Sequence, residues 1–480
     1  MQSPVEETLS PTPKASACSQ VPIDILHEIL PYCMPPYPTI RSTTQLISSL
    51  SQVSSTWRAA VRSSPQLWCR LLVTLRRNDD LNHCAQMVTQ WFEHAPSLSL
   101  ALFLNIDFVA DDDEDIARIR TFLVDLSSVM LRVRRFAFHS KITTKLMCAF
   151  VDLEWKLPQL KILDLLSHDR LDHVNPVAFS VPLFHNVPNL DEVAIGNAMT
   201  WATDITHILP WSRLTHIRLK YETSISRWIE VMNMCPQMRF CSVHIDDDYY
   251  SPPCSPSGIH HGLKRLFLHF SNGETSFVKL LSLYQLPSLF TLCVNYSPEL
   301  ELPFNFFPCP QGISALTNIQ HFTFNAGGIK FPRKYITYLA EVLREMVNLE
   351  ELDLEQTTQK FIPLYRALSF NRPKEAILPK LTALALWVSS VPQASEIKKE
   401  LEPLLDMLSS RSGKETIPVG FEPLEGFILG VATEGIYERM RELFDPWVGG
   451  LPSRLHFSIE LNRSTRCNQP DGWTQPISDY

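Results

Sequence analysis

The fragments of this 480-residue chain that come nearest to catalytic or metal-binding motifs lack the spacing their chemistry requires. His27 and Glu28 begin a pair like that of zinc proteases, but no second histidine follows four residues after the first, so one helix face cannot present two imidazoles to zinc. His260 and His261 have no cysteine or carboxylate at ligand spacing and are expected in a loop. The acidic run at 111–115 lacks the glycine and closing glutamate of a calcium loop, so we interpret it as the acidic start of a helix.

Nucleophile elbows and phosphate-binding loops are also missing. The chain contains no Gly-x-Ser-x-Gly, Gly-x-x-x-x-Gly-Lys-Ser/Thr or Gly-x-Gly-x-x-Gly string. We therefore expect no catalytic residues, no metal site and no cofactor. An enzyme is the less favoured class of protein.

Composition and charge narrow the class further. The chain is 45% hydrophobic, enough to bury a large core, and its net charge of −8 comes without a long basic block, so we expect no nucleic-acid partner. The start lacks the features of a signal peptide and no later stretch approaches the roughly 20 apolar residues of a membrane span, so we expect no membrane and a place in the cytoplasm or nucleus. Residues 1–20 are predicted to be a disordered tail, and residues 466–480 a C-terminal tail.

Residues 21–70 are predicted to form a small module of three short helices. The stretches TTQLISSLSQ and SSTWRAAVRSS follow a first helix that begins at Pro22. The apolar side chains of this first helix fall on two faces: Ile23, Leu26 and Leu30 on one, Ile25 and Ile29 on the other. Three short helices bury little of their surface, so the surplus apolar surface requires a partner, either the rest of the chain or another protein.

The strings VPIDILHEIL and LISSLSQVSSTWRAAVRSSPQLW, between Val21 and Trp68, resemble an F-box. They are similar to its Leu-Pro-x-Glu-Ile-Leu opening, its Val-Cys-Lys-x-Trp-Arg centre and its Ser-Pro-x-Leu-Trp ending. The sequence departs from that pattern in its first loop, which is longer, and at four positions: Val21, Asp24, Ser54 and Ser55. None of these departures removes a large buried group.

This resemblance implies that the first two helices bind the small adaptor subunit of cullin-RING ubiquitin ligases. The adaptor-facing candidates are Val21, Pro22, Ile25, Leu26, Ile29 and Leu46. Four others are expected to tie the third helix to the module and to the following domain: Trp57, Val61, Leu67 and Trp68. Ordinary core packing is an alternative for every one of these side chains.

From about residue 95 onward the apolar pattern LxxLxxLxL recurs. Nine copies begin at Leu157, Val187, Trp211, Cys235, His260, Leu286, Leu316, Met346 and Leu378. The steps of roughly 24 to 32 residues are near the leucine-rich-repeat period. Helical stretches such as SISRWIEVMNM separate the copies, so each unit is expected to run strand, loop, helix. The predicted fold class is α/β: a three-helix F-box module followed, over residues 71–465, by a leucine-rich-repeat solenoid with a parallel concave sheet.

Strand alternation places the leucines of the pattern inside and the residues between them on the concave face. The expected buried column is Leu163, Val193, Ile217, Cys241, Leu266, Leu292, Phe322, Leu352 and Leu384. The target-binding candidates on the concave face are Arg218, Lys220, Arg265, Phe267 and His269, and an acidic trio lies further on: Glu351, Asp353 and Glu355. Such a surface is typical of one that recognises a protein of matching charge. A solvated face without a partner, and a target site on the loop at 246–258, stay open as alternatives.

These features predict a substrate-recognition adaptor of an SCF-type ubiquitin ligase, in which the F-box binds the adaptor subunit and the repeats bind a target protein of unknown identity. One rival is an F-box and leucine-rich-repeat scaffold without ligase activity. The other is an enzyme or receptor built on the repeats, which would require a deep pocket with convergent polar groups. The combination is similar to the expanded fungal F-box families, in which targets vary widely.

Overall fold

The computed structural model forms two compact units, which are separated in sequence between Lys161 and Ile162. It describes residues 21–35, 37–110, 112–140, 146, 150, 153, 155–167, 182–196, 209–246, 258–271, 277–297, 313–325, 333–356, 362–371, 376–388, 394–413, 417–431, 433–448 and 455–461. The predicted tails at 1–20 and 466–480, and most of the loop at 246–258, lie outside the described residues.

The first unit begins with the three predicted helices. They are α1 (Ile23–Ile29), α2 (Ile40–Val53) and α3 (Ser55–Ser63), and the short 3-10 turn η2 (Leu30–Cys33) follows α1. Local hydrogen bonds set their starts, because Thr39 and Ser42 form a capping box at α2 and the Ser54 side chain accepts from the Trp57 amide at α3. The core between the helices consists of Leu26, Leu30, Ala60, Val61 and Leu67, all at most 1% exposed. Three helices thus share one small apolar core.

Three strands and the helices between them follow in the described part of the first unit. After the turn η3 (Pro65–Trp68) come β1 (Arg70–Leu75), α4 (Leu81–Glu93), β2 (Leu100–Ile106), α5 (Asp113–Asp125), α6 (Ser127–Met130) and β3 (Val133–Ser140). The three strands pair in parallel in the order β1-β2-β3. The nine copies of the apolar pattern do not include β1 and β2, although turns of the same kind precede both strands. The Leu67 amide donates to the Ser64 carbonyl at 3.3 Å, and the Leu98 amide donates to the Ala95 carbonyl at 3.4 Å.

The helices α1–α3 pack directly on these first repeats. The Trp68 ring lies 4.8 Å from that of Trp91 and 4.5 Å from that of His94, both at the end of α4. The Tyr37 ring meets Phe103 of β2 edge-on at 5.0 Å between centroids. The expectation that Trp68 joins the helices to the following segment is confirmed, and the helices belong to the same compact unit as β1–β3.

The second unit is a continuous ladder of parallel strands. The strands, in spatial and sequence order, are β4 (Ile162–Ser167), β5 (Glu192–Ile195), β6 (His216–Thr223), β7 (Phe240–Ile245), β9 (Arg265–Phe270), β11 (Thr291–Tyr296), β12 (His321–Asn325), β13 (Glu351–Gln356), β14 (Ala383–Val388), β15 (Gly426–Val431) and β16 (His456–Leu461). A separate small sheet pairs β8 (Gly258–Ile259) with β10 (Tyr284–Gln285). Each strand of the ladder follows its neighbour in the chain, as in a solenoid.

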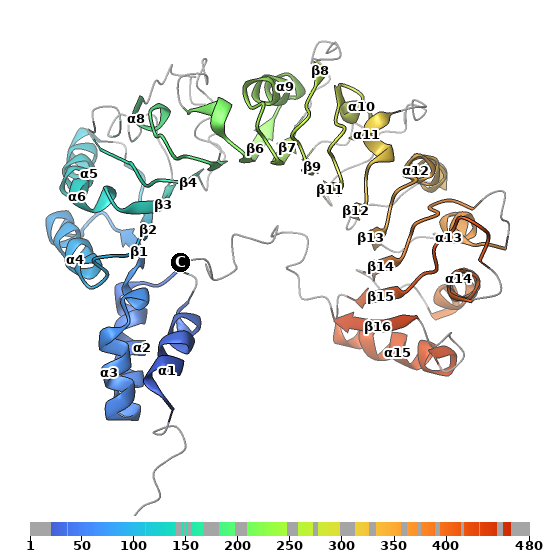
Figure 1. Ribbon diagram of the computed structural model, residues 1–480, viewed down its shortest axis with the longest axis horizontal. Coiled ribbons are helices and arrows are strands. Elements are labelled where there is room, and N and C mark those ends of the chain that lie inside the picture. Colours follow the sequence, from blue (N-terminus) through green and yellow to red (C-terminus); the bar gives the residue numbers. More distant parts are fainter. Residues whose placement is uncertain are drawn as a thin grey trace, which may run out of the picture. The chain divides into compact units, whose positions relative to one another are not determined.

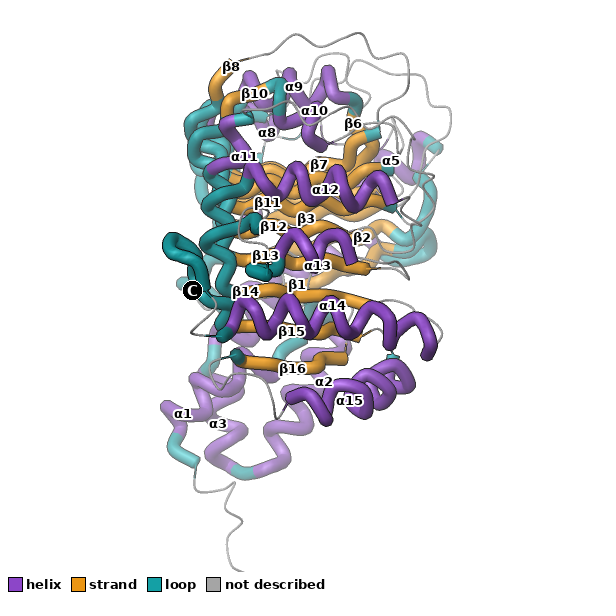
Figure 2. The backbone as a smooth tube through the Cα atoms, turned by 90° about the vertical axis from the view of Figure 1, so that its right-hand side faces the viewer, coloured by secondary structure: helices purple, strands orange, loops and turns teal. Residues whose placement is uncertain are grey.

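Helices and short turns connect the strands of the second unit. They are α8 (Pro182–His185), η5 (Trp211–Arg213), α9 (Ile225–Met234), α10 (Phe277–Leu281), α11 (Ser314–Thr317), α12 (Arg333–Glu345), α13 (Ile362–Leu368), α14 (Ala394–Ser412) and α15 (Glu434–Val448). Within this unit the strands line the inner side of a curve and the helices lie on its outer side (Figure 1). Figure 2 shows α12, α13 and α14 stacked along the ladder with their axes in the direction of the strands. The predicted α/β class with a parallel sheet on the concave side is therefore observed.

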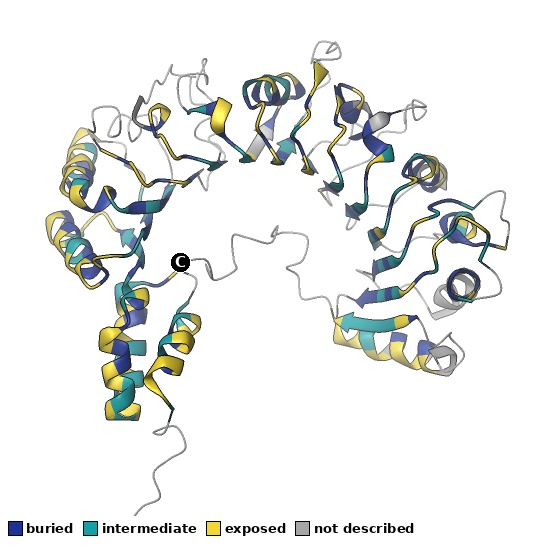
Figure 3. Ribbon diagram, viewed as in Figure 1, coloured by how far each residue is buried: buried dark blue, intermediate teal, exposed yellow. Residues whose placement is uncertain are grey.

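The predicted buried column is confirmed residue by residue. The strand register pairs each of its members with the next, from Leu163 opposite Val193 to Leu352 opposite Leu384. Every member is at most 1% exposed. Figure 3 shows buried residues along the strands and exposed residues on the outer helices. A turn sets this register before most strands, as when the Leu349 amide donates to the Met346 carbonyl at 3.0 Å.

Replacing Leu352 by Ala is expected to lower the free energy of unfolding of the second unit by about 2 to 5 kcal/mol. The Leu352 side chain is 1% exposed and lies in the column between Phe322 and Leu384, so its loss leaves a cavity as well as forfeiting apolar burial. Urea unfolding followed by circular dichroism measures the change. Val347→Ala, at a side chain that is 44% exposed, is the control and should change stability little. Equal effects of the two variants would contradict the assigned core.

Candidate functional site

The first candidate surface is the apolar face of α1. Ile25 and Ile29 lie on one face of α1 and are 46% and 42% exposed, whereas the opposite face packs on α3 through Leu26. Ile23, at the start of the helix on the Leu26 side, is also 42% exposed. Tyr32 in the following turn is 65% exposed. A helix of seven residues with three exposed isoleucines is unusual for a surface that stays in water. This face therefore meets the requirement for docking onto another protein.

The six predicted adaptor-facing residues are distributed unevenly over the helices. Ile25 and Ile29 lie in the exposed face, and Pro22 beside them is exposed. Val21 packs against the core at the start of α1, and Leu46 on α2 is half-buried. The structure thus brings Pro22, Ile25 and Ile29 together as an accessible surface.

Leu26 is a correction to the predicted set. Its side chain is 0% exposed and lies in the core with Leu30, Ala60 and Val61. The face of α1 that contains Leu26 and Leu30 packs against α3, so Leu26 has no accessible surface to offer. The sequence showed that α1 is apolar on two faces, but only the packing of α3 decides which face stays open.

The second candidate surface is formed by the concave residues of β6, β7 and β9. Phe267 on β9 is half-buried, and its ring lies 5.2 Å from that of Phe240 on β7. The guanidinium carbon of Arg218 lies 5.2 Å from the centre of the Phe240 ring, and that of Arg265 lies 5.8 Å from the Phe290 ring. Cation–π contacts of this length hold the guanidinium groups against aromatic rings. Arg218, Arg265 and Phe267 are therefore near one another, as predicted.

Phe240 and Phe290 are missing from the predicted site. Phe240 pairs in register with both His216 and Arg265, so it occupies the same outward position on β7 that those residues occupy on β6 and β9. Its ring contacts those of His216 and Phe267 and the Arg218 guanidinium. Strand alternation was the signal that could have placed Phe240 on the concave face, but the predicted site did not include it. Phe290, just before β11, supports the Arg265 guanidinium. This contact depends on the side-chain conformation of Arg265, which the sequence does not indicate.

Lys220 departs from the predicted ladder. The pairing of β6 with β7 shifts between Leu219 and Glu222, so Lys220 lies in a β-bulge, where its side chain is exposed. A bulge turns a side chain out of the regular alternation. Lys220 is accessible, but it lies outside the regular register of β6 with β7.

His269 on β9 is held as a neutral imidazole. Its ring stacks on that of His244 at 4.6 Å, and the Asn295 side-chain amide nitrogen lies 3.3 Å from its Nδ1, which must therefore accept. Burial lowers the pKa of His269 to about 3, and the neighbouring His244 contributes to the shift. His269 therefore adds an uncharged aromatic ring to the concave face rather than a cation.

The second unit is expected to lose stability between pH 6.5 and 4.5 in a manner that depends on His269. Because the pKa of His269 is lower in the folded than in the unfolded chain, the unfolded chain takes up a proton that the folded chain excludes as pH falls below about 6.5. Unfolding midpoints in urea across this range measure the effect. His269→Gln should flatten the pH dependence, whereas His261→Gln, at an exposed histidine, should leave it as in the wild type. Identical slopes for all three proteins would contradict the assignment.

The acidic trio lies on β13, at some distance along the ladder. Glu351 Oε2 lies 3.0 Å from Nδ1 of His321 on β12, and burial raises the pKa of Glu355. The Trp387 ring, opposite Glu355 in the register, covers Gly430 so closely that a Cβ there would have no room. The concave surface thus changes from basic and aromatic on β6–β9 to acidic on β13.

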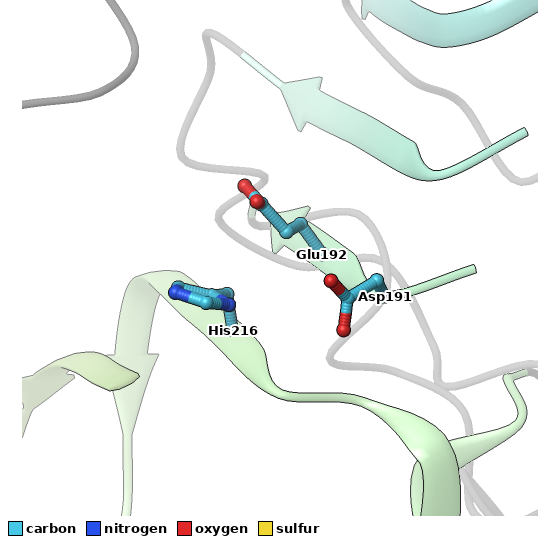
Figure 4. Close-up of side chains that lie close together, drawn as sticks. All are labelled: Asp191, Glu192 and His216. Atoms are coloured by element: carbon cyan, nitrogen blue, oxygen red, sulfur yellow. The ribbon is translucent and has the colours of Figure 1, made fainter. Parts of the chain in front are cut away.

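Asp191, Glu192 and His216 form a cluster of potential metal ligands at the starts of β5 and β6 (Figure 4). One ligand atom from each lies within 4.8 Å of the others. The Thr215 hydroxyl lies 2.5 Å from Asp191 Oδ1 and 2.7 Å from His216 Nδ1, so hydrogen bonds already join two of the three groups. Two carboxylates and one imidazole suit zinc chemically. Because the Thr215 hydroxyl already bonds to Asp191 and His216, we interpret these groups as a hydrogen-bond network and assign no metal.

The residues that resembled parts of catalytic or metal-binding motifs in the sequence make contacts that stabilise the fold. His27 Nε2 lies 3.0 Å from the Ser63 hydroxyl and so links α1 to α3. His260 is buried directly after β8, with its Nε2 2.8 Å from the Cys235 carbonyl oxygen. The acidic run does start a helix, because the Asp112 carboxylate caps α5 by accepting from the Asp115 amide at 2.6 Å.

Comparisons with known proteins identify no family. No protein-family model and no curated protein matches the chain. One similar solved structure is an uncharacterised protein from Bacteroides fragilis, with 12% sequence identity, a TM-score of 0.29, and coverage of 60% of this chain and 80% of that one. A similarity of this size assigns no function. In the described part of the chain, no helix combines the length and apolar character needed to cross a membrane.

Proposed function

We propose that this chain is the substrate-recognition adaptor of an SCF-type ubiquitin ligase, working in the cytoplasm or nucleus. In this proposal α1–α3 are an F-box that binds the adaptor subunit, and the strand ladder is a leucine-rich-repeat domain that binds a target protein. The observation that carries the proposal is the exposed isoleucine face of α1, which coincides with the strings that resemble an F-box. The chain needs no catalytic residue for this role, because other subunits transfer ubiquitin.

Energetics support docking through α1. Complete burial of an isoleucine side chain contributes about 1.5 to 3 kcal/mol, and Ile23, Ile25 and Ile29 are each a little over two-fifths exposed. Covering them would contribute about 1 kcal/mol each before the costs of association. The half-buried Leu46 and the exposed Val53 on α2 extend the apolar surface.

Co-purification tests the proposal. The tagged full chain is expressed in a eukaryotic cell and recovered under mild conditions, and the bound material is probed for the ligase adaptor subunit and for a cullin. We expect both. Recovery of the adaptor without a cullin would favour the rival proposal, a scaffold outside the ligase. Recovery of neither would overturn the F-box assignment.

A further inference from the structure

Two arginines of the second unit are supported by aromatic rings on the concave face. Arg218 on β6 lies over Phe240, and Arg265 on β9 lies over Phe290, at 5.2 and 5.8 Å from the ring centres. Stacking restricts the rotation of a guanidinium group, and Arg265 is exposed while Arg218 is half-buried. Such groups lose less side-chain entropy when they bind a carboxylate, so they are pre-organised for it.

Other exposed cations lie next to these arginines. Arg239 directly precedes β7 and Lys264 directly precedes β9, and both are exposed. We call the set Arg218, Arg239, Lys264, Arg265, Phe240 and Phe267 the basic-aromatic surface. Parallel neighbouring strands are about 4.8 Å apart, so these cations lie within a short distance at the amino ends of β6, β7 and β9.

Carboxylates bound this surface on both sides. The first two outward positions of β6, β7, β9 and β11 hold no acidic residue: His216, Arg218, Phe240, Ser242, Arg265, Phe267, Thr291 and Cys293. On one side, Asp191 directly precedes β5 and Glu192 begins it, and on the other side Glu350 directly precedes β13 and Glu351 begins it. A long polyanion such as nucleic acid would meet these carboxylates, whereas a short acidic segment fits between them.

We propose that the basic-aromatic surface binds a short, extended, acidic segment of the target protein. This inference rests on the proposed function, in which the repeats bind a target, and it names the chemistry of that target. Arg218 on β6 and Arg265 on β9 are separated by two inter-strand spacings, because β7 lies between these strands. They are therefore about 10 Å apart in the direction across the strands. An extended chain advances about 3.3 Å per residue, so carboxylates two to four residues apart reach both arginines. An apolar side chain between them lies against Phe267.

Fluorescence polarisation of a labelled peptide tests this proposal on the full chain. The probe is a short peptide of serine and glycine with two glutamates four positions apart and a tryptophan midway between them. We expect saturable binding that weakens as salt is raised, because Arg239, Lys264 and Arg265 are exposed in the free protein and Arg218 is half-buried. Arg265→Glu should weaken binding about tenfold or more, and Arg265→Gln should have a smaller effect.

Matched controls separate this proposal from general charge effects. Arg344→Glu changes the same charge at an exposed site on the helix α12 and should bind the probe like the wild type. A second probe with glutamines in place of the glutamates should bind at least tenfold more weakly. Equal affinity for the two probes, or equal losses in Arg265→Glu and Arg344→Glu, would overturn the proposal. Co-purification of the adaptor is measured separately and tests the F-box proposal. If the adaptor is not recovered, the peptide measurement still tests the basic-aromatic surface.

Discussion

Replacing Ile25 and Ile29 by aspartate is expected to abolish binding of the ligase adaptor subunit while the chain stays folded. Both side chains are exposed on α1, so the charges are solvated in the free protein, but they would be buried without a counter-charge in the complex. Pulldown of the purified adaptor by the tagged variant measures the loss, and circular dichroism confirms the fold. The peptide affinity of the concave surface should not change.

The matched control places the same two substitutions on another helical segment of the first unit. Val124 on α5 is 50% exposed and Leu131 after α6 is 42% exposed, so Val124→Asp with Leu131→Asp changes charge and hydrophobicity equally. This control should bind the adaptor normally. Full binding by the Ile25 and Ile29 variant would show that α1 is not the docking surface. Leu26→Asp does not serve as a test, because a charge at this 0% exposed position would disrupt the core of the helices themselves.

Arg411→Met is expected to lower the free energy of unfolding of the second unit by about 3 to 5 kcal/mol, because a buried acceptor left without a donor costs about 1 to 3 kcal/mol and three are affected. Arg411 on α14 is 0% exposed, and its guanidinium donates to the carbonyl oxygens of Leu368, Ile377 and Leu378. Methionine fills much of the space but leaves these carbonyls buried without donors. Denaturant unfolding measures the change, and Arg366→Met, on the exposed surface of α13, is the control.

Several contacts explain why Arg411 should have so large an effect. Its guanidinium carbon also lies 4.4 Å from the centre of the Phe370 ring. Burial lowers the pKa of Arg411 to about 9, which leaves the group charged at neutral pH. One of the carbonyls it binds belongs to Leu378, whose φ of 59° lies in the left-handed region that costs a branched residue free energy. Similar stabilities of Arg411→Met and Arg366→Met would show that these contacts are dispensable.

The sequence by itself determined the repeat region in detail. The LxxLxxLxL pattern predicted the strands from β4 to β14 and the complete buried column, because a local turn followed by strict alternation sets both the start of a strand and its inward face. The acidic run at the start of α5 was also predictable, since capping and the helix dipole act within one turn. These features depend on contacts close in sequence.

Tertiary structure alone decided which candidate residues are accessible. Leu26 and Ile25 are neighbours with similar side chains, yet the packing of α3 buries one and leaves the other exposed. Arg218 stacks on Phe240 of β7, and Arg265 stacks on Phe290 in the turn before β11. The irregularity at Lys220 arises from the pairing of β6 with β7. Arg411 is charged but buried, because three carbonyls from residues 368–378 converge on it. Each outcome depends on contacts between residues distant in sequence, which local patterns do not encode.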